Sequence, residues 1–175
     1  VGIGIFDLCL GQSDNSISVK RKKELTGRSW PNGCHVAEVE IDAETGEVRL
    51  DRYVSVDDVG NTVNPMIVHG QVQGGIASGL GQAVLERTEY DASGQLLSGS
   101  YMDYALPRAD DMPSLSGSLF EKAPCLTNPL GAKGTGEIGA VAGPPAIVHA
   151  VIDALAEKGI TQVDMPLQPQ KIWEC

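Results

Sequence analysis

The sequence predicts an α+β domain with a two-layer ββαβα arrangement, in which helices cover a small sheet. Three observations lead to this prediction. Residues 36–41 and 48–56 alternate apolar and polar side chains, as half-buried strands do. Residues 65–86 and 146–158 repeat apolar side chains with helical spacing. Between these two helices, residues 116–122 alternate weakly and predict a third strand.

The composition indicates a folded, acidic protein. A chain of 175 residues can bury one good core. Thirteen basic against twenty-three acidic residues give a net charge of −10, which would repel a phosphate backbone, so we expect no nucleic-acid partner. No apolar run approaches membrane-spanning length, so we expect no membrane partner either. The four cysteines lack metal-type spacing, and we interpret them as reduced thiols of a cytoplasmic protein.

We expect the chain to consist of a weakly patterned N-terminal segment followed by a folded domain. Residues 1–28 carry little pattern beyond a short strand over 1–6 and the basic cluster 20–23, which we interpret as a linker or a solvated surface. Residues 29–175 are expected to form the domain. Because the chain begins with Val1, we also expect it to be a piece of a longer polypeptide.

The two predicted strands form a hairpin around the turn at residues 43–46. The residues expected on its inward face are Ala37, Val39, Ile41, Val48, Leu50, Val54 and Val56. Asp57 and Asp58 follow the second strand. Since successive strand residues point to opposite faces, we interpret these two as turn and capping residues rather than metal ligands.

Asn64 and Pro65 predict the start of the first helix, as N-cap and first helical residue. Its apolar stripe comprises Val68, Val72, Ile76, Leu80 and Val84. The helix also holds five glycines, at 70, 74, 75, 79 and 81. Each costs about 1 kcal/mol relative to alanine, so we expect a close contact with another backbone or a ligand. Gln71, Ser78 and Gln82 share a further face, where solvent exposure and a binding role are equal alternatives.

The second helix is predicted over residues 146–158, with Gly159 as its C-terminal stop. Its inward face comprises Ile147, Val148, Val151, Ile152 and Leu155. His149 lies off that face, and we expect it to be exposed rather than a ligand. Residues 162–167 are expected to close the chain as a strand or an extended tail.

The most informative stretch is residues 128–139, NPLGAKGTGEIG, where Glu137 stands among glycines and Lys133 shortly precedes it. Glycines at this density let the backbone turn tightly and let another molecule approach it closely. Glu137 is therefore either a helix cap or a working base.

The glycines at 134, 136 and 139 also have the spacing of a dinucleotide fingerprint. We reject that interpretation because Pro129 interrupts the strand that should precede the first glycine. Pro144 and Pro145 also fall where the following helix should run.

Four stretches resemble the C-terminal part of molybdenum hydroxylase large subunits, the family of xanthine dehydrogenase, aldehyde oxidoreductase and aerobic carbon monoxide dehydrogenase. They are residues 31–42 (PNGCHVAEVEID), 69–82 (HGQVQGGIASGLGQ), 101–111 (YMDYALPRADD) and 128–139. The amino-acid sequences of these stretches are most similar to those of carbon monoxide dehydrogenase-like large subunits. The resemblance covers roughly residues 30–174, and residues 1–28 match poorly.

This resemblance implies one lobe of a molybdopterin (molybdenum cofactor) binding domain in an oxidoreductase acting on a small substrate. Glu137 would be the base that deprotonates the metal-bound hydroxyl, and no side chain would bind the metal directly. The residues implied to lie along the cofactor are Gln71, Lys133, Gly134, Thr135 and Gly136.

The resemblance also implies partners. The upstream cofactor segments, the iron–sulfur cysteines and the flavin site of such enzymes have no counterpart in these residues, so we expect them on the rest of the large subunit and on iron–sulfur and flavin subunits or domains. Alone, the chain is expected to fold, to lack the cofactor and to be inactive, and the alternative function is a module for structure or subunit assembly. In the isolated chain the small-residue face of the first helix would be partly uncovered. A homodimer that covers this face is therefore a further alternative.

Overall fold

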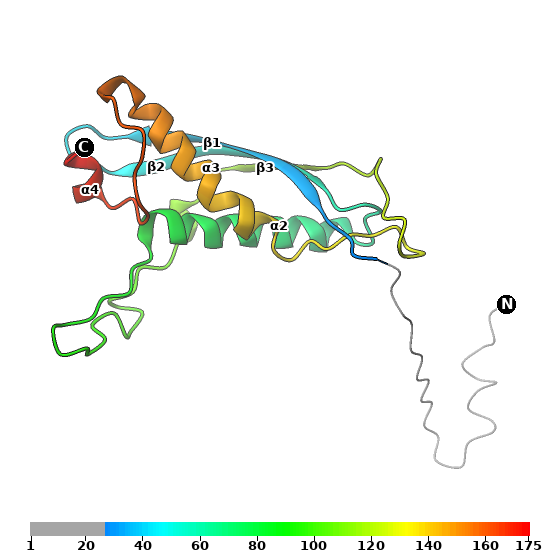
Figure 1. The fold of residues 1–175 in the computed structure, drawn as a ribbon, viewed down its shortest axis with the longest axis horizontal. Helices are drawn as coiled ribbons and strands as arrows, with labels where there is room; N and C mark the ends of the chain where they lie inside the picture. The colour runs from blue at the N-terminus through cyan, green and yellow to red at the C-terminus, as the bar shows by residue number, and fades with distance from the viewer. Residues whose placement is uncertain (1–26) are drawn as a thin grey trace, which may run out of the picture.

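The computed structural model describes residues 27–175, which build a three-stranded sheet and the helices that cover one of its faces (Figure 1). β1 (Asn32–Ile41) pairs antiparallel with β2 (Val48–Asp58), and β3 (Leu115–Leu119) adds to β2 in parallel. The predicted ββαβα order is confirmed. The strand predicted over 1–6 and the basic cluster 20–23 lie outside the described residues.

The hairpin contains a β-bulge that the alternation did not predict. Glu38 pairs with Arg52 but Val39 pairs with Leu50, so Asp51 is an extra residue in β2. A bulge of one residue moves the following side chains to the opposite face. The prediction that Val54 and Val56 point inward is therefore wrong: they are 39% and 43% exposed, whereas the inward residues beyond the bulge are Tyr53, Ser55 and Asp57.

Helix α2 (Pro65–Leu80) begins as predicted, with the side chain of Asn64 accepting a hydrogen bond of 3.2 Å from the backbone amide of Ile67. A π-helical turn, Gly81–Leu85, continues it to the predicted end. Four residues of its apolar stripe pack on the inward face of the sheet in one core cluster with Leu50 and Tyr53, namely Val72, Ile76, Leu80 and Val84.

Helix α3 (Ile138–Ala154) begins earlier than predicted and contains both prolines. One reason for rejecting a dinucleotide fingerprint is therefore wrong, although β3 ends at Leu119, far before the first glycine of that pattern. Proline lacks an amide donor and normally disrupts a helix interior. Here Pro144 is buried against Gly79 of α2, and we infer that this packing offsets the lost hydrogen bond.

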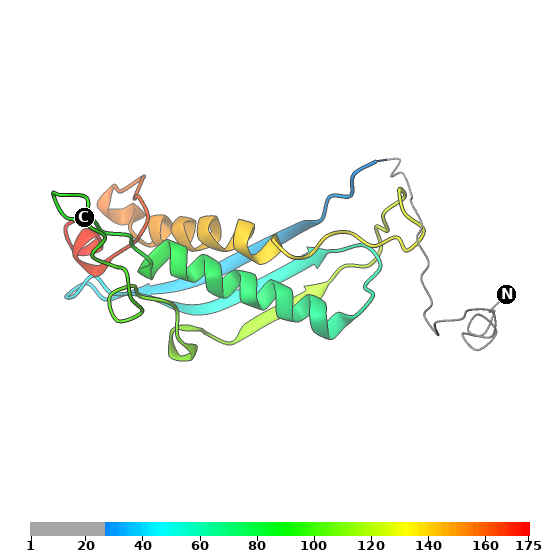
Figure 2. The same ribbon diagram turned by 90° about the horizontal axis from the view of Figure 1, so that it is seen from below.

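Helices α2 and α3 lie side by side and approach at their backbones (Figure 2). A Cβ added at Gly75 would lie 2.7 Å from the backbone nitrogen of Ala140, and one at Gly79 would lie 3.0 Å from Cα of Gly143. The predicted close backbone contact is thus found at these two glycines. Gly70 and Gly74 meet no described atom within 4 Å.

The C-terminal segment closes the core. Gly159, with a φ of 79°, follows the short 3-10 helix Ala156–Lys158 as the predicted stop. Residues 162–167 form no strand, but the fully buried Leu167 donates its amide to the carbonyl of Ala83 at 2.7 Å. Helix α4 (Pro169–Trp173), which was not predicted, packs against the hairpin turn at Gly46. None of the described helices is long and apolar enough to cross a membrane.

Candidate functional site

The glycine-rich loop is attached to the body of the protein at two places. At the first, residues 131–133 lie against the connection that follows β2. The amide of Lys133 donates to the carbonyl of Val59 at 2.7 Å, and the amide of Asn61 donates to the carbonyl of Gly131 at 2.9 Å. An antiparallel bridge joins Gly60 to Ala132 between them.

The second attachment is at Gly139, in the first turn of α3. A Cβ there would lie 2.7 Å from the backbone nitrogen of Ile76 and 2.9 Å from the carbonyl carbon of Gly75, so α3 rests directly on α2. Between the two attachments, residues 134–137 form a short segment that ends in Glu137 and is exposed except at the half-buried Thr135. Gly134 meets no described atom within 4 Å where its Cβ would be.

Glu137 stands immediately before α3 with its side chain exposed. Its side chain makes no capping hydrogen bond to the helix. Within residues 27–175 its carboxylate has no hydrogen-bond or ion-pair partner. The cap interpretation of Glu137 is therefore wrong for this structure, and the carboxylate is available to another molecule.

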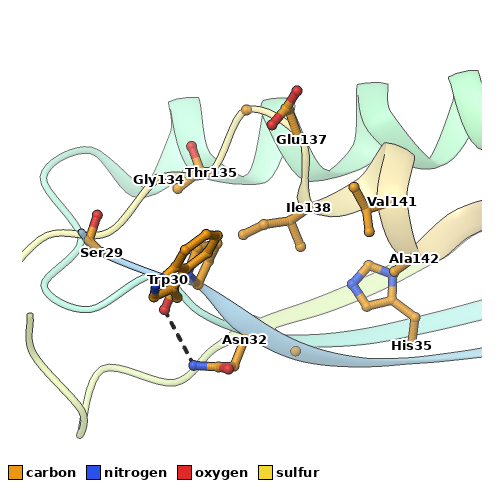
Figure 3. A pocket seen from close by; sticks show the side chains of 13 residues that line it. Ser29, Trp30, Asn32, His35, Gly134, Thr135, Glu137, Ile138, Val141 and Ala142 are labelled. Atoms are coloured by element: carbon orange, nitrogen blue, oxygen red, sulfur yellow. Dashed lines mark hydrogen bonds between the residues drawn. The ribbon is translucent and has the colours of Figure 1, made fainter.

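Glu137 lines a cleft of about 710 Å³ between the start of β1 and the start of α3 (Figure 3). One side is residues 29–35, where the indole of Trp30 is 68% exposed. The other side is residues 134–142, which contribute the apolar side chains of Ile138 and Val141. In the view of Figure 3, these two side chains lie between Glu137 and His35. The lining is thus mainly apolar, with one carboxylate that has no partner in the described part of the chain.

Of the other predicted site residues, Gln71 lies beside the glycine-rich segment. Its Oε1 would be 3.9 Å from a Cβ at Gly136, although Gln71 belongs to α2 and lies far away in the sequence. Gly134, Thr135 and Gly136 line the cleft together with Glu137. The structure therefore brings Gln71 and residues 134–137 to one place.

The side chain of Lys133 points elsewhere. Its Nζ lies 2.6 Å from Oδ2 of Asp58 at the end of β2, and the two side chains are 10% and 12% exposed. Burial would raise the pKa of Asp58, but hydrogen bonds from Lys133 and the amide of Gly60, and the charge of Lys133, outweigh it and lower the pKa below its usual 3.8. Asp58 does take part in a turn, as predicted, but its main partner is Lys133.

A polar cluster under the cleft was missed from the sequence. His35 lies with Nε2 2.9 Å from Oδ1 of Asp57 and Nδ1 3.0 Å from the hydroxyl of Tyr53. Burial, and then the negative charge of Asp57, raise the pKa of Tyr53. The prediction that Asp57 serves in a turn is wrong, because Asp57 is 1% exposed and bonded to His35. The period-two spacing of Tyr53, Ser55 and Asp57 was the sequence signal that could have revealed this cluster.

Among residues 27–175, no group of three or more potential ligands is placed to hold a metal ion.

Comparison with known proteins gives a consistent result. Residues 11–113 match the model of the molybdopterin cofactor-binding domain family. The chain is 37% identical over 146 residues to the carbon monoxide dehydrogenase large chain of Hydrogenophaga pseudoflava, covering 83% of this chain and 18% of that protein. It is 38% identical over 143 residues to the nicotine 6-hydroxylase large subunit of Paenarthrobacter nicotinovorans, covering 82% and 17%.

A solved structure agrees with these sequence relatives. Quinoline 2-oxidoreductase from Pseudomonas putida 86 superposes with a TM-score of 0.79 at 42% identity, over 82% of this chain and 18% of that one. The chain thus spans less than a fifth of the length of the relatives it matches.

Proposed function

Because this chain belongs to the molybdopterin cofactor-binding domains of molybdenum hydroxylase large subunits, we propose that its cleft is one wall of an active site that oxidatively hydroxylates a small substrate, with Glu137 as the general base. The observation that carries this proposal is the exposed carboxylate of Glu137, without a partner among the described residues, in a mainly apolar cleft. A positioned carboxylate that is free to take up a proton suits a general base.

The residues beside Glu137 fit a bound cofactor. At Gly134 no described atom occupies the space of a missing Cβ, and at Gly136 only Gln71 approaches it. A bare backbone of this kind lets a flat, polar molecule approach closely. Molybdopterin would hold molybdenum there and supply the two-electron redox chemistry. We assign its contacts to Gln71, Thr135 and the backbone of Lys133, Gly134 and Gly136.

The remaining steps belong to residues of this chain. The exposed indole of Trp30 and the side chains of Ile138 and Val141 give a small substrate an apolar surface. The Glu137 carboxylate accepts the proton released as the substrate is hydroxylated. Its side chain lies at the end of a segment held at both ends and has no partner among residues 27–175, so none of the described hydrogen bonds must be broken first.

The length of the chain bears on what it does alone. It spans less than a fifth of its relatives, so we propose that the rest of the large subunit supplies the other wall of the active site. Iron–sulfur and flavin subunits or domains would then carry the electrons away, in a cytoplasmic enzyme. Residues 29–175, without that other wall, form a folded and inactive module.

Glu137→Gln in the complete large subunit tests the proposed base, because glutamine keeps the shape but cannot take up the proton. Turnover should fall by about 10²–10⁴-fold, while molybdenum content stays near that of the wild type. The assay uses the compounds in the relatives' names (carbon monoxide, nicotine and quinoline) with an artificial electron acceptor.

The control is Glu157→Gln, an exposed carboxylate in the 3-10 helix that follows α3, which should leave turnover unchanged. If Glu137 were structural only, its glutamine variant would turn over normally and lose at most about 0.5–2 kcal/mol of stability. That result would overturn the proposed base.

A further inference from the structure

We propose that Asp58 and Lys133 form a positioning pair for Glu137, which fixes the start of the segment that carries the base. This inference rests on the proposed role of Glu137. It gives Lys133 a different task from the cofactor contact that its place in the glycine-rich motif implies.

The ion pair is nearly buried. Nζ of Lys133 lies 2.6 Å from Oδ2 of Asp58, and only about a tenth of each side chain is exposed. The Lys133 ammonium is therefore directed to the end of β2, and Lys133 is not among the residues that line the cleft. In such a pair, loss of one partner leaves a buried charge uncompensated, so the pair strongly favours a single arrangement.

The backbone around the pair is equally constrained. The amide of Lys133 donates to the carbonyl of Val59 at 2.7 Å, and the second oxygen of Asp58, Oδ1, accepts from the amide of Gly60 at 2.9 Å. One ion pair and two backbone hydrogen bonds, the second from the amide of Asn61 to the carbonyl of Gly131, thus join the same two segments. Together they place residue 133 on the end of β2.

The position of Glu137 follows from the two ends of its segment. Residues 134–137 run from this attachment to Gly139, which is pressed against the backbone of α2. Four residues reach at most about 14 Å when fully extended, so a shift of residue 133 passes directly to Glu137. A misplacement of about 1 Å can cost 10²-fold in rate, so the pair matters to catalysis without touching substrate.

The test compares four variants in the complete holoenzyme: Lys133→Met, Lys133→Arg, Glu137→Gln and the double variant Lys133→Met/Glu137→Gln. Lys133→Met should lower turnover per bound molybdenum by about 10–10²-fold with little change in KM. Lys133→Arg should restore most of the rate. The double variant should be no slower than Glu137→Gln alone, since a pair that acts only through Glu137 has nothing left to position.

A second readout does not depend on activity. Hydrogen exchange of the hydrogen-bonded amides of Lys133 and Asn61, which join residues 131–133 to the end of β2, should become faster in Lys133→Met, by about 10-fold or more, and return toward wild type in Lys133→Arg. The exposed Lys122 serves as the matched control, and Lys122→Met should change neither exchange nor turnover. If Lys133→Met does not fold, Asp58→Asn/Lys133→Met removes both charges together and serves in its place.

Three results would overturn the inference: wild-type exchange and turnover in Lys133→Met, loss of molybdenum with unchanged exchange, or a double variant slower than Glu137→Gln by the full Lys133→Met factor. The second would mean that the side chain of Lys133 contacts the cofactor directly. Failure of the proposed function is separate, because it appears as normal turnover in Glu137→Gln, whereas the exchange experiment decides independently whether the pair anchors the segment.

Discussion

At the scale of single residues, two adjacent carboxylates at the end of β2 have different surroundings. Asp57 points into the protein and meets the imidazole of His35 at 2.9 Å. Asp58 points the other way and meets the ammonium of Lys133 at 2.6 Å. The ion pair between Asp58 and Lys133 holds the glycine-rich loop of the candidate site. Because the pair requires an ionised Asp58, the stability of the domain should depend on pH.

The pKa of Asp58 is lowered from 3.8, since its bonds to Lys133 and Gly60 outweigh the effect of burial. A carboxyl with a lowered folded-state pKa stabilises the fold above its unfolded value and stops doing so as the pH falls through the folded value. The wild-type chain should therefore melt above Asp58→Asn at pH 7, and this gap should close below pH 3.8.

Thermal melts between pH 7 and pH 2 would measure the gap. Asp153→Asn, at an exposed position on α3, should show no gap at any pH and is the control. A gap for Asp58→Asn that stays constant down to pH 2 would contradict the role given to the ion pair.

At the scale of elements, glycines decide how closely α2 and α3 approach. Two glycines of α2 face glycines or a proline of α3 at backbone distance, while two others on the same helix face open space. Glycines at neighbouring positions of α2 thus have different surroundings, since some allow close contact with α3 and others face open space. The adjacent pair Gly74 and Gly75 gives a matched comparison.

Gly75→Ala should destabilise the chain by about 1–3 kcal/mol, because its Cβ would lie 2.7 Å from the backbone nitrogen of Ala140 and would force the helices apart. Gly74→Ala should instead stabilise by about 0.5–1 kcal/mol, since alanine favours the helix and meets nothing there. Urea unfolding followed by circular dichroism would give both values. Equal effects of the two substitutions would refute this account of the helix contact.

At the scale of the whole molecule, the helices of residues 27–175 cover only one face of the sheet (Figure 2). On the opposite face the cross-strand neighbours Val36 and Val54 are 60% and 39% exposed, and Val56, two residues further along β2, is 43% exposed. Contiguous exposed apolar residues are typical of surfaces that contact another protein or domain. This surface agrees with the proposal that this chain, which spans less than a fifth of its relatives, forms one wall of a larger site.

The purified chain should therefore bind molybdopterin weakly or not at all, because the proposed site in its cleft would contact the cofactor from one side only. Molybdenum measured by mass spectrometry should be far below stoichiometric, while circular dichroism shows a folded α+β domain. Stoichiometric molybdenum in the chain alone would contradict the proposal that the rest of the large subunit is needed.

Local patterns predicted much of the fold and part of the candidate site. The helix start at Asn64 and Pro65, the hairpin and the order ββαβα are confirmed, because each depends on residues close together in sequence. The glycine-rich motif directed attention to Glu137, whose proposed catalytic role stays a prediction. The start of α3 was placed too late, because Pro144 and Pro145 favour a break and only their packing against α2 shows that the helix tolerates them.

The sequence by itself determined the elements that short-range periodicity and capping control, and the resemblance of its motifs to a known family. Only the tertiary structure decided which face of β2 is buried, since the bulge at Asp51 depends on pairing with β1. Only the tertiary structure shows that Lys133 contacts Asp58, and that Gln71 lies beside Gly136. It also shows that the side chains of His35 and Asp57 are buried together. These contacts join residues that are remote along the chain, and the folded backbone sets their distances, so no local pattern records them.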